Sequence, residues 1–240
     1  MKKELLTVKS NRPLNESVFE LVLSGASPMK AGQFAEITAQ GFYLRRPISL
    51  ADYADGKITL LVKKVGEGTK CLSRLQVGDK VDALTCLGNG FDVNAEKPLL
   101  VGGGIGCAPL YRLAKEFAEK GIRATAVLGF RNAGEIYYEK EFSAVCDTVI
   151  ATDDGSRGFK GNVVAAIEAQ GIEFDRYFAC GPVVMMRALA GRFPNGQLSL
   201  EARMGCGFGA CMGCSIKTTS GFKRVCKEGP VFDASEVIWE

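Results

Sequence analysis

The stretch "LLVGGGIGCAPL", residues 99–110, divides this sequence into two kinds of pattern. A short apolar run ends in glycines, and the following residues, 108–121, place Leu110, Leu113 and Phe117 on one face of an expected helix. Gly121 is a stop signal for that helix. A strand, a glycine turn and a helix in this order are typical of a parallel α/β unit, whose helix N-terminus is suited to a pyrophosphate.

The residues that follow this unit continue the alternation of strand and helix. Apolar strand patterns lie at 123–130, 147–152, 176–180 and 197–202, and helical patterns lie at 161–171 and 182–192. This alternation predicts a parallel α/β domain. Residues 205–229 are rich in glycine and cysteine, and the ending "GPVFDASEVIWE" (229–240) is expected to be a docked tail.

The residues that precede the unit have a different pattern. Five short apolar or alternating runs (4–10, 17–24, 33–38, 57–64 and 80–88) are separated by turn residues, and 68–75 is the one expected short helix. Such runs indicate an antiparallel barrel or sandwich. We therefore expect three parts, at 1–96, 97–200 and 201–240.

Composition limits the possible functions. The net charge of the 240 residues is only +3, which gives no case for nucleic acid or an anionic membrane as a partner. No run of eighteen apolar residues and no signal peptide is found, so we expect a cytoplasmic protein. The chain has no histidine, which excludes Ser-His-Asp and Cys-His nucleophiles and zinc sites with imidazole ligands.

The segment "GCGFGACMGC" (205–214) contains three of the nine cysteines. Cys206, Cys211 and Cys214 have the spacing Cys-x4-Cys-x2-Cys, and Cys226 follows. This is the plant-type spacing for a [2Fe-2S] cluster, and the glycines let the backbone direct N–H groups at the sulfur atoms. A structural zinc site with four cysteines is the alternative, although such sites usually pair two short Cys-Cys knuckles. The other five cysteines are mostly expected to be small buried hydrophobes.

Two glycine turns indicate a nucleotide site. Gly102-x-Gly104 lacks the third glycine of the dinucleotide fingerprint, because Cys107 stands near that place, so a tight structural turn is equally compatible. A second turn, "ACGP" (179–182), also follows a strand and precedes a helix. Since ligands bind beyond the carboxyl ends of parallel strands, two such turns favour the nucleotide interpretation.

The N-terminal part has two further features. Arg45 and Arg46 precede a proline in "YLRRPISL" (43–50), and "VGEGTKCL" (65–72) is a glycine turn that leads into the short helix. An arginine and a helix N-terminus together are suited to a second pyrophosphate. A solvated edge strand is the alternative for the arginine pair.

Taken in order, "RRPIS", "GEGT", "VGGGIG", "CGP" and the cysteine loop resemble the ferredoxin-reductase family over the whole chain. More narrowly, the cysteine loop and "ATDDGSRGFKGNV" (151–163) resemble the electron transfer subunits of NAD-linked dihydroorotate dehydrogenases. The resemblance implies a flavin-binding barrel, a nicotinamide-binding domain and a [2Fe-2S] loop. Cys206, Cys211, Cys214 and Cys226 would then be the cluster ligands.

The resemblance also implies the binding residues for the other cofactors. Those for FAD would be Arg46, Pro47, Ile48, Ser49, Leu61, Val62, Lys63, Gly68 and Thr69. Those for NAD would be Gly102, Gly103, Gly104, Gly106, Cys180 and Gly181. Arg131 is compatible with a 2′-phosphate, so the sequence leaves NAD and NADP open. No side chain is assigned an acid–base role, because the cofactors carry the difficult steps.

The implied activity is a relay of electrons. A partner subunit with FMN would oxidise dihydroorotate in pyrimidine biosynthesis, and electrons would pass through the cluster to FAD and as a hydride to NAD. A heterotetramer with two subunits of each kind is implied. Two alternatives remain: a diaphorase subunit of another complex, such as an NADH-dependent ferredoxin:NADP reductase or a hydrogenase, and a zinc-stabilised module that is not an enzyme.

Overall fold

The N-terminal part of the protein is a closed antiparallel barrel. The computed structural model describes residues 1–239, and the barrel's strand order is β1-β2-β5-β4-β3-β6. Its strands are β1 Lys2–Pro13, β2 Val18–Ser24, β3 Phe34–Ile37, β4 Arg46–Ala54, β5 Lys57–Lys63 and β6 Lys80–Leu87, with helix α1 (Glu67–Leu72) between the last two. Alternate strand residues such as Leu21, Leu23 and Leu60 fill its interior, as the period of a half-buried strand requires. The structure therefore selects the barrel over the sandwich.

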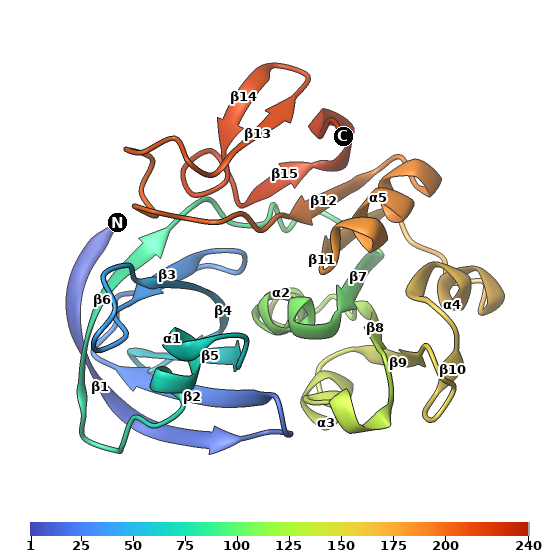
Figure 1. The fold of residues 1–240 in the computed structure, drawn as a ribbon. Coiled ribbons are helices and arrows are strands. Elements are labelled where there is room, and N and C mark those ends of the chain that lie inside the picture. The colour runs from blue at the N-terminus through green and yellow to red at the C-terminus, as the bar shows by residue number, and fades with distance from the viewer. Residues whose placement is uncertain (240) are drawn as a thin grey trace.

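The second part is a seven-stranded sheet covered by helices, beside the barrel (Figure 1). The strand order is β10-β9-β8-β7-β11-β12-β15. Its strands are β7 Pro98–Gly103, β8 Thr125–Phe130, β9 Asp147–Thr152, β10 Phe159–Lys160, β11 Arg176–Cys180, β12 Gly196–Ser199 and β15 Val231–Asp233. All pairs are parallel except β12 with β15. The strand order reverses direction between β7 and β11, which is where open α/β sheets bind ligands.

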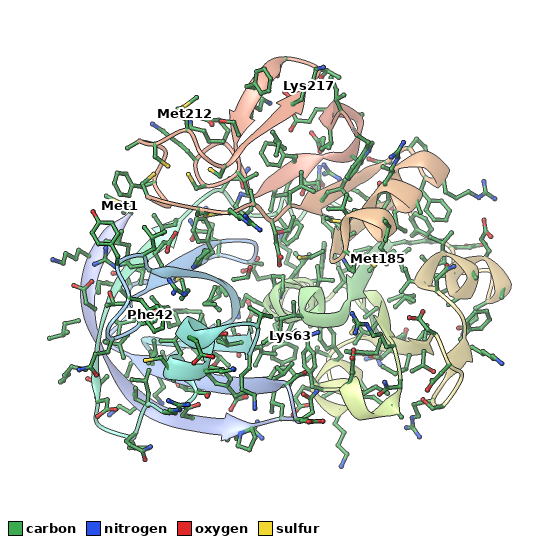
Figure 2. All side chains as sticks on the ribbon, viewed as in Figure 1. Met1, Phe42, Lys63, Met185, Met212 and Lys217 are labelled. Carbon is green, nitrogen blue, oxygen red and sulfur yellow. The ribbon has the colours of Figure 1, made fainter. Side chains whose placement is uncertain are left out.

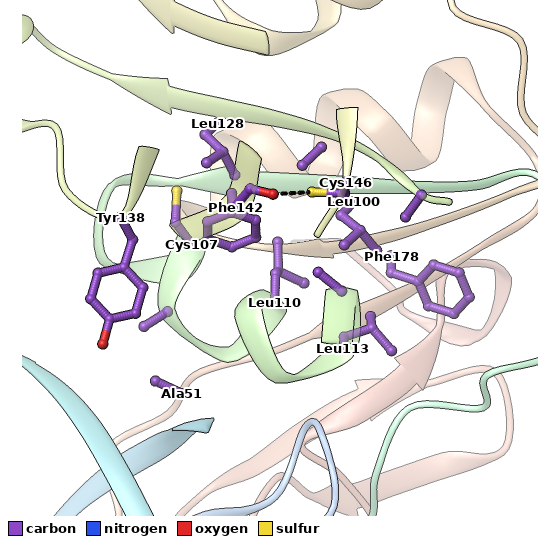
Figure 3. Packing of buried hydrophobic residues seen from close by; sticks show 14 of the residues in the cluster. Ala51, Leu100, Cys107, Leu110, Leu113, Leu128, Tyr138, Phe142, Cys146 and Phe178 are labelled. Carbon is purple, nitrogen blue, oxygen red and sulfur yellow. Dashed lines mark hydrogen bonds between the residues drawn. The ribbon is translucent and has the colours of Figure 1, made fainter. Parts of the chain in front are cut away.

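The helices of this part include α2 Ala108–Glu119, α3 Glu139–Ser143, α4 Val163–Ala169 and α5 Val183–Arg192, with 3-10 turns η1 Gly104–Cys107 and η2 Ala133–Glu135. Helix α2 buries Leu110, Leu113 and Phe117 completely. Figure 3 shows Leu110 and Leu113 of this helix between the sheet and the barrel residue Ala51. The expected apolar face of this helix is confirmed, and it joins the two parts.

The third part leaves the sheet after β12 and returns to it (Figure 1). Between these points it crosses to the barrel, carries four cysteines and forms a hairpin of β13 (Ser215–Thr218) and β14 (Gly221–Arg224). Strand β15 then pairs antiparallel with β12, and the turn η3 (Ala234–Glu236) follows. The expected docked tail is present, since Val237 bridges Thr218 of the hairpin. Its last residue, Glu240, lies outside the described residues.

Several details differ from expectation. Helix α1 ends at Leu72, so the expected helix at 68–75 is too long. Helix α3 was not expected, because it has only five residues and too little length for a visible period. Cys107, Cys146 and Cys180 are buried as expected, whereas Cys71 and Cys86 are partly exposed. Within residues 1–239, no helix is long and apolar enough to cross a membrane.

Candidate functional site

The two glycine turns of the α/β domain lie against each other. Strands β7 and β11 are parallel neighbours, with Gly102 opposite Cys180, so the turns that follow them meet at one edge of the sheet. A Cβ atom on Gly106 would lie 2.3 Å from the Cys180 carbonyl oxygen, and one on Gly103 would lie 2.7 Å from Pro182. Only glycine permits this approach of the two turns. Gly104 and Gly181 at this edge are half-buried, so their backbone is partly accessible to a ligand.

The arginine and the short helix of the barrel also meet. A Cβ atom on Gly68, in the first turn of α1, would lie 2.1 Å from Nε of Arg46. The Arg46 guanidinium also stacks on the ring of Phe42, 4.9 Å from its centroid. Arg46, at the first position of β4, is therefore held beside the N-terminus of α1, as a site for a phosphate group requires.

The neighbouring residues have structural partners. Arg45 pairs with Asp82 and donates from Nε to Thr38 Oγ1 at 3.2 Å, so it braces the barrel wall. The Thr69 hydroxyl accepts from the backbone N–H of Val65 at 3.0 Å and donates to the Gly66 carbonyl at 2.9 Å, which fixes the turn before α1. Of the two arginines, Arg46 alone is therefore directed at the glycine turn.

Strand β5 connects the barrel to the glycine turn that follows β7. Strand β5 contacts η1, which contains Gly104 and Gly106. Leu61 belongs to the core shared with α2, whereas Val62 points into the barrel interior and Lys63 is half-buried. On β4, Pro47, Ile48 and Ser49 pair with β3 and are half-buried. Figure 2 shows Lys63 of the barrel and Met185 of α5 on either side of the region where the two parts meet.

The four cysteines form two pairs. Cys206 Sγ accepts from the backbone N–H of Ala210 at 3.2 Å and of Cys211 at 3.5 Å, so the first pair is Cys206 with Cys211. Cys214 Sγ accepts from the Cys226 N–H at 3.4 Å, which makes the second pair. The second pair is buried and Cys211 is exposed. The sulfur atoms gather beside Met212 in the upper part of Figure 2.

The environment of Cys206 favours a thiolate. Burial by itself would raise the pKa of this thiol, but backbone N–H groups of Cys211, Phe208 and Ala210 lower it to about 6. Burial raises the pKa of Cys226 to about 12, with the neighbouring Cys214 sulfur acting in the same direction. A nearby cation would favour the thiolate form of Cys226.

The pairing suits two metal ions better than one. A [2Fe-2S] cluster needs two thiolates for each iron, whereas zinc needs four ligands around one ion. The two pairs and the N–H groups directed at sulfur therefore fit the cluster.

Glu36 on β3 is a functional candidate that the sequence analysis missed. It is only 2 % exposed, and its Oε1 has no hydrogen-bond partner among the described residues. A Cβ atom on Gly207 would lie 2.4 Å from this oxygen, so the cysteine loop rests on Glu36. Burial raises the pKa of Glu36 to about 7 against the attraction of Arg45. Alternation in β3 indicated that this side chain points out of the barrel, but not that the loop covers it.

Comparison with known proteins identifies the family. Residues 201–238 match the iron–sulfur cluster binding domain of dihydroorotate dehydrogenase B, and residues 100–190 match the oxidoreductase NAD-binding domain. The dihydroorotate dehydrogenase B (NAD+) electron transfer subunit of Bacillus caldolyticus is 46% identical, with 98% of each chain covered. This chain belongs to the family of dihydroorotate dehydrogenase B electron transfer subunits. The expected family is thereby confirmed.

Solved structures agree with this family and with the fold. A structure of NADH-dependent reduced ferredoxin-NADP oxidoreductase has a TM-score of 0.90 and 31% identity, covering 98% of this chain and 90% of that one. The FAD/NAD-binding domain of Vibrio cholerae nitric oxide dioxygenase has a TM-score of 0.69 at 20% identity, covering 78% of this chain and 91% of that one, and shows the fold alone. The predicted fold, oxidoreductase class and cofactors FAD, [2Fe-2S] and NAD are confirmed.

Proposed function

We propose that this chain passes electrons from a partner subunit that oxidises dihydroorotate with FMN to NAD+, in cytoplasmic pyrimidine biosynthesis. The supporting observation is the meeting of three features: the Arg46–Gly68 contact, the paired glycine turns and the cysteine loop on Glu36. When bound, the cluster and FAD supply one-electron and hydride steps that no protein side chain supplies. The described residues serve to bind and orient these groups and to set their surroundings.

For FAD, we assign the pyrophosphate to Arg46, Gly68 and Thr69. The guanidinium beside the first turn of α1 supports this, because both present N–H groups to an anion. The flavin would lie along β4 and β5, and its neighbours would be Pro47, Ile48, Ser49, Leu61, Val62 and Lys63. The contact of β5 with η1 would then bring the flavin beside the nicotinamide.

For NAD, we assign the edge formed by the turns after β7 and β11. Gly103 and Gly106 allow the two turns to meet, and the N-terminus of α2 follows directly. The complete set would be Gly102, Gly103, Gly104, Gly106, Cys180 and Gly181. For the cluster, we assign Cys206 and Cys211 to one iron and Cys214 and Cys226 to the other.

The partner subunit would dock over the cysteine loop. Three large apolar side chains are exposed there: Phe208 is 44%, Met212 is 53% and Phe222 is 73% exposed. Phe208 and Met212 lie in the loop itself, and Phe222 lies on the hairpin that follows it. Exposed aromatic and methionine side chains are typical of interface centres. We further propose the division at 1–96, 97–200 and 201–240, and a heterotetramer with two of each subunit.

The test is a visible spectrum of the protein purified without oxygen, followed by additions of NADH and NADPH. Flavin bands on an iron–sulfur background, bleached by NADH much more than by NADPH, are expected. The protein is then mixed with an FMN-containing dihydroorotate dehydrogenase subunit, and dihydroorotate should drive NAD+ reduction. A coloured protein that reduces NADP+ from ferredoxin instead would favour the activity of its structural neighbour. A colourless protein would contradict the proposal.

A further inference from the structure

Arg224, at the end of β14, links the two cysteine pairs. Its Nη1 donates to the carbonyl of Gly209 at 2.6 Å, and Gly209 lies between Cys206 and Cys211. The segment that carries Arg224 also carries Cys226 and is tied to the second pair, because the Val225 N–H donates to the Cys214 carbonyl at 3.1 Å. The Arg224–Gly209 hydrogen bond therefore connects the segment that carries Cys226 to the loop that carries Cys206 and Cys211.

Glu228 fixes the direction of this guanidinium. Arg224 Nε donates to Glu228 Oε2 at 2.9 Å, its Nη2 bonds the other carboxylate oxygen, and its backbone N–H donates to Oε2 at 2.8 Å. Glu228 thus occupies Nε and Nη2 of the guanidinium, and Nη1 is directed at Gly209. A lysine ammonium is a single charge on a flexible stem and has no such planar fork.

The peptide group between Gly209 and Ala210 is held on both sides. Its carbonyl, from Gly209, accepts from Arg224 Nη1 at 2.6 Å, and its N–H, from Ala210, donates to Cys206 Sγ at 3.2 Å. Gly209 has φ of +92°, and a Cβ atom there would lie 2.6 Å from the Lys227 side chain. The Gly209–Ala210 peptide is therefore oriented so that its N–H meets Cys206 of the first cysteine pair and its carbonyl meets Arg224.

We propose that Arg224, braced by Glu228, is a positioning residue that directs the N–H of the Gly209–Ala210 peptide at the Cys206 sulfur and so raises the reduction potential of the [2Fe-2S] cluster. This inference rests on the proposed cluster ligands. Hydrogen bonds from N–H groups to cluster sulfurs and nearby positive charge both stabilise the reduced cluster.

The test compares Arg224→Lys and Arg224→Gln with the wild-type protein. The midpoint potential of the cluster is measured in a redox titration followed by electron paramagnetic resonance. A positioning role predicts that both variants lower the potential, since lysine keeps the charge but loses the fork. If Arg224→Lys matches the wild type, charge alone acts and the proposal fails. Arg192→Lys, at an ion pair with Glu168 on α5, is the matched control and should leave the potential unchanged.

A second measurement covers the case in which a variant does not load the cluster. Hydrogen exchange of the amides at 206–211 is measured in the cluster-free proteins, with FAD absorption as the check on folding. Loss of the Arg224 contact should speed exchange in this segment in both variants, and unchanged exchange would overturn the inference. A wild-type protein that binds no cluster would contradict the proposed function. The exchange comparison would still test the Arg224–Gly209 contact by itself.

Discussion

Glu36 places a carboxyl group where the barrel and the cysteine loop exclude water. Its pKa is raised to about 7 from 4.5, first of all by burial, so the folded protein binds this proton more tightly than the unfolded chain does. Between pH 4.5 and about pH 7 the folded protein binds more protons than the unfolded chain does. The free energy of unfolding therefore falls as the pH rises through this range. Glu36→Gln removes this dependence because glutamine carries no charge at any pH.

We therefore expect the change in unfolding free energy caused by Glu36→Gln to be more favourable at about pH 8 than at about pH 5 in the cluster-free protein. The difference should reach up to roughly 3 kcal/mol, at about 1.4 kcal/mol per pKa unit. Denaturant unfolding of both proteins at the two pH values measures the difference. Glu16→Gln, at an exposed glutamate in the turn between β1 and β2, is the control for loss of a carboxylate away from the cysteine loop. An equal effect of Glu36→Gln at both pH values would contradict the prediction.

Gly68 permits the close approach of Arg46. Gly68→Ala would place a Cβ atom 2.1 Å from Arg46 Nε, so the guanidinium must move from the first turn of α1. We expect retention of FAD to fall by about tenfold or more, since about 1.4 kcal/mol of lost binding is tenfold. The measurement is the ratio of flavin to protein absorbance after dialysis.

Gly66→Ala, two residues earlier, is the matched control. A Cβ atom at Gly66 meets nothing within 4 Å, and the backbone there is extended, with φ of −168°. FAD retention should therefore stay close to that of the wild type. If both alanine variants lost FAD equally, the cause would be a change in α1 and not displacement of Arg46.

Residue types predicted some of the site and not the rest. Cysteine spacing and the glycine turns are visible in sequence because few other residues fit those roles. In the sequence, Glu36 is an ordinary residue of an expected strand, and Arg224 lies in the glycine- and cysteine-rich segment with no motif of its own. Their importance arises from contacts with Gly207 and Gly209, residues brought to them by folding. No local period records such contacts.

At the scale of elements, the hairpin and strand β15 are, like helix α3 and the short strand β10, parts that sequence patterns did not predict. Strand β15 has three residues and becomes a strand only by pairing with β12, more than thirty residues earlier. The hairpin β13–β14 has four residues on each strand and is supported by the tail, where the Ile238 N–H donates to the Lys217 carbonyl at 3.2 Å. Isolated hairpins of this length are marginal, so tertiary contacts decide them.

The hairpin also presents Phe222 to solvent. If the partner docks over the cysteine loop, Phe222→Ser should weaken the complex by about 2 kcal/mol or more, roughly thirtyfold in Kd, as for a buried interface aromatic. Flavin and cluster absorption should stay unchanged. Val184→Ser, on α5, is the control, because Val184 is 78% exposed and lies outside the loop and hairpin. Unchanged affinity of the Phe222→Ser protein would place the partner elsewhere.

At the scale of the whole molecule, the barrel and the α/β domain share one core and a polar seam. Helix α2 packs its apolar face against barrel residues including Ala51 and Leu61. At the edge of this contact, Lys115 of α2 pairs with Asp52 of β4 at 2.6 Å, and the Ala31 N–H donates to Glu116 at 3.1 Å. An interface of this kind should couple the unfolding of the two parts and fix the distance between their binding sites.

The Asp52–Lys115 pair allows this coupling to be tested. The Asp52 and Lys115 side chains are only 16% and 25% exposed, so Asp52→Asn leaves a poorly solvated ammonium without its carboxylate. We expect a loss of about 1–3 kcal/mol in the free energy of unfolding, the usual penalty for an unpaired buried group. Asp55→Asn is the control, because Asp55 is exposed in the turn after β4 and asparagine tolerates its positive φ of 51°. If the two parts are coupled, Asp52→Asn shifts the fluorescence transition of Trp239 and the far-ultraviolet dichroism transition together. Separate shifts would show that the barrel and the α/β domain unfold independently.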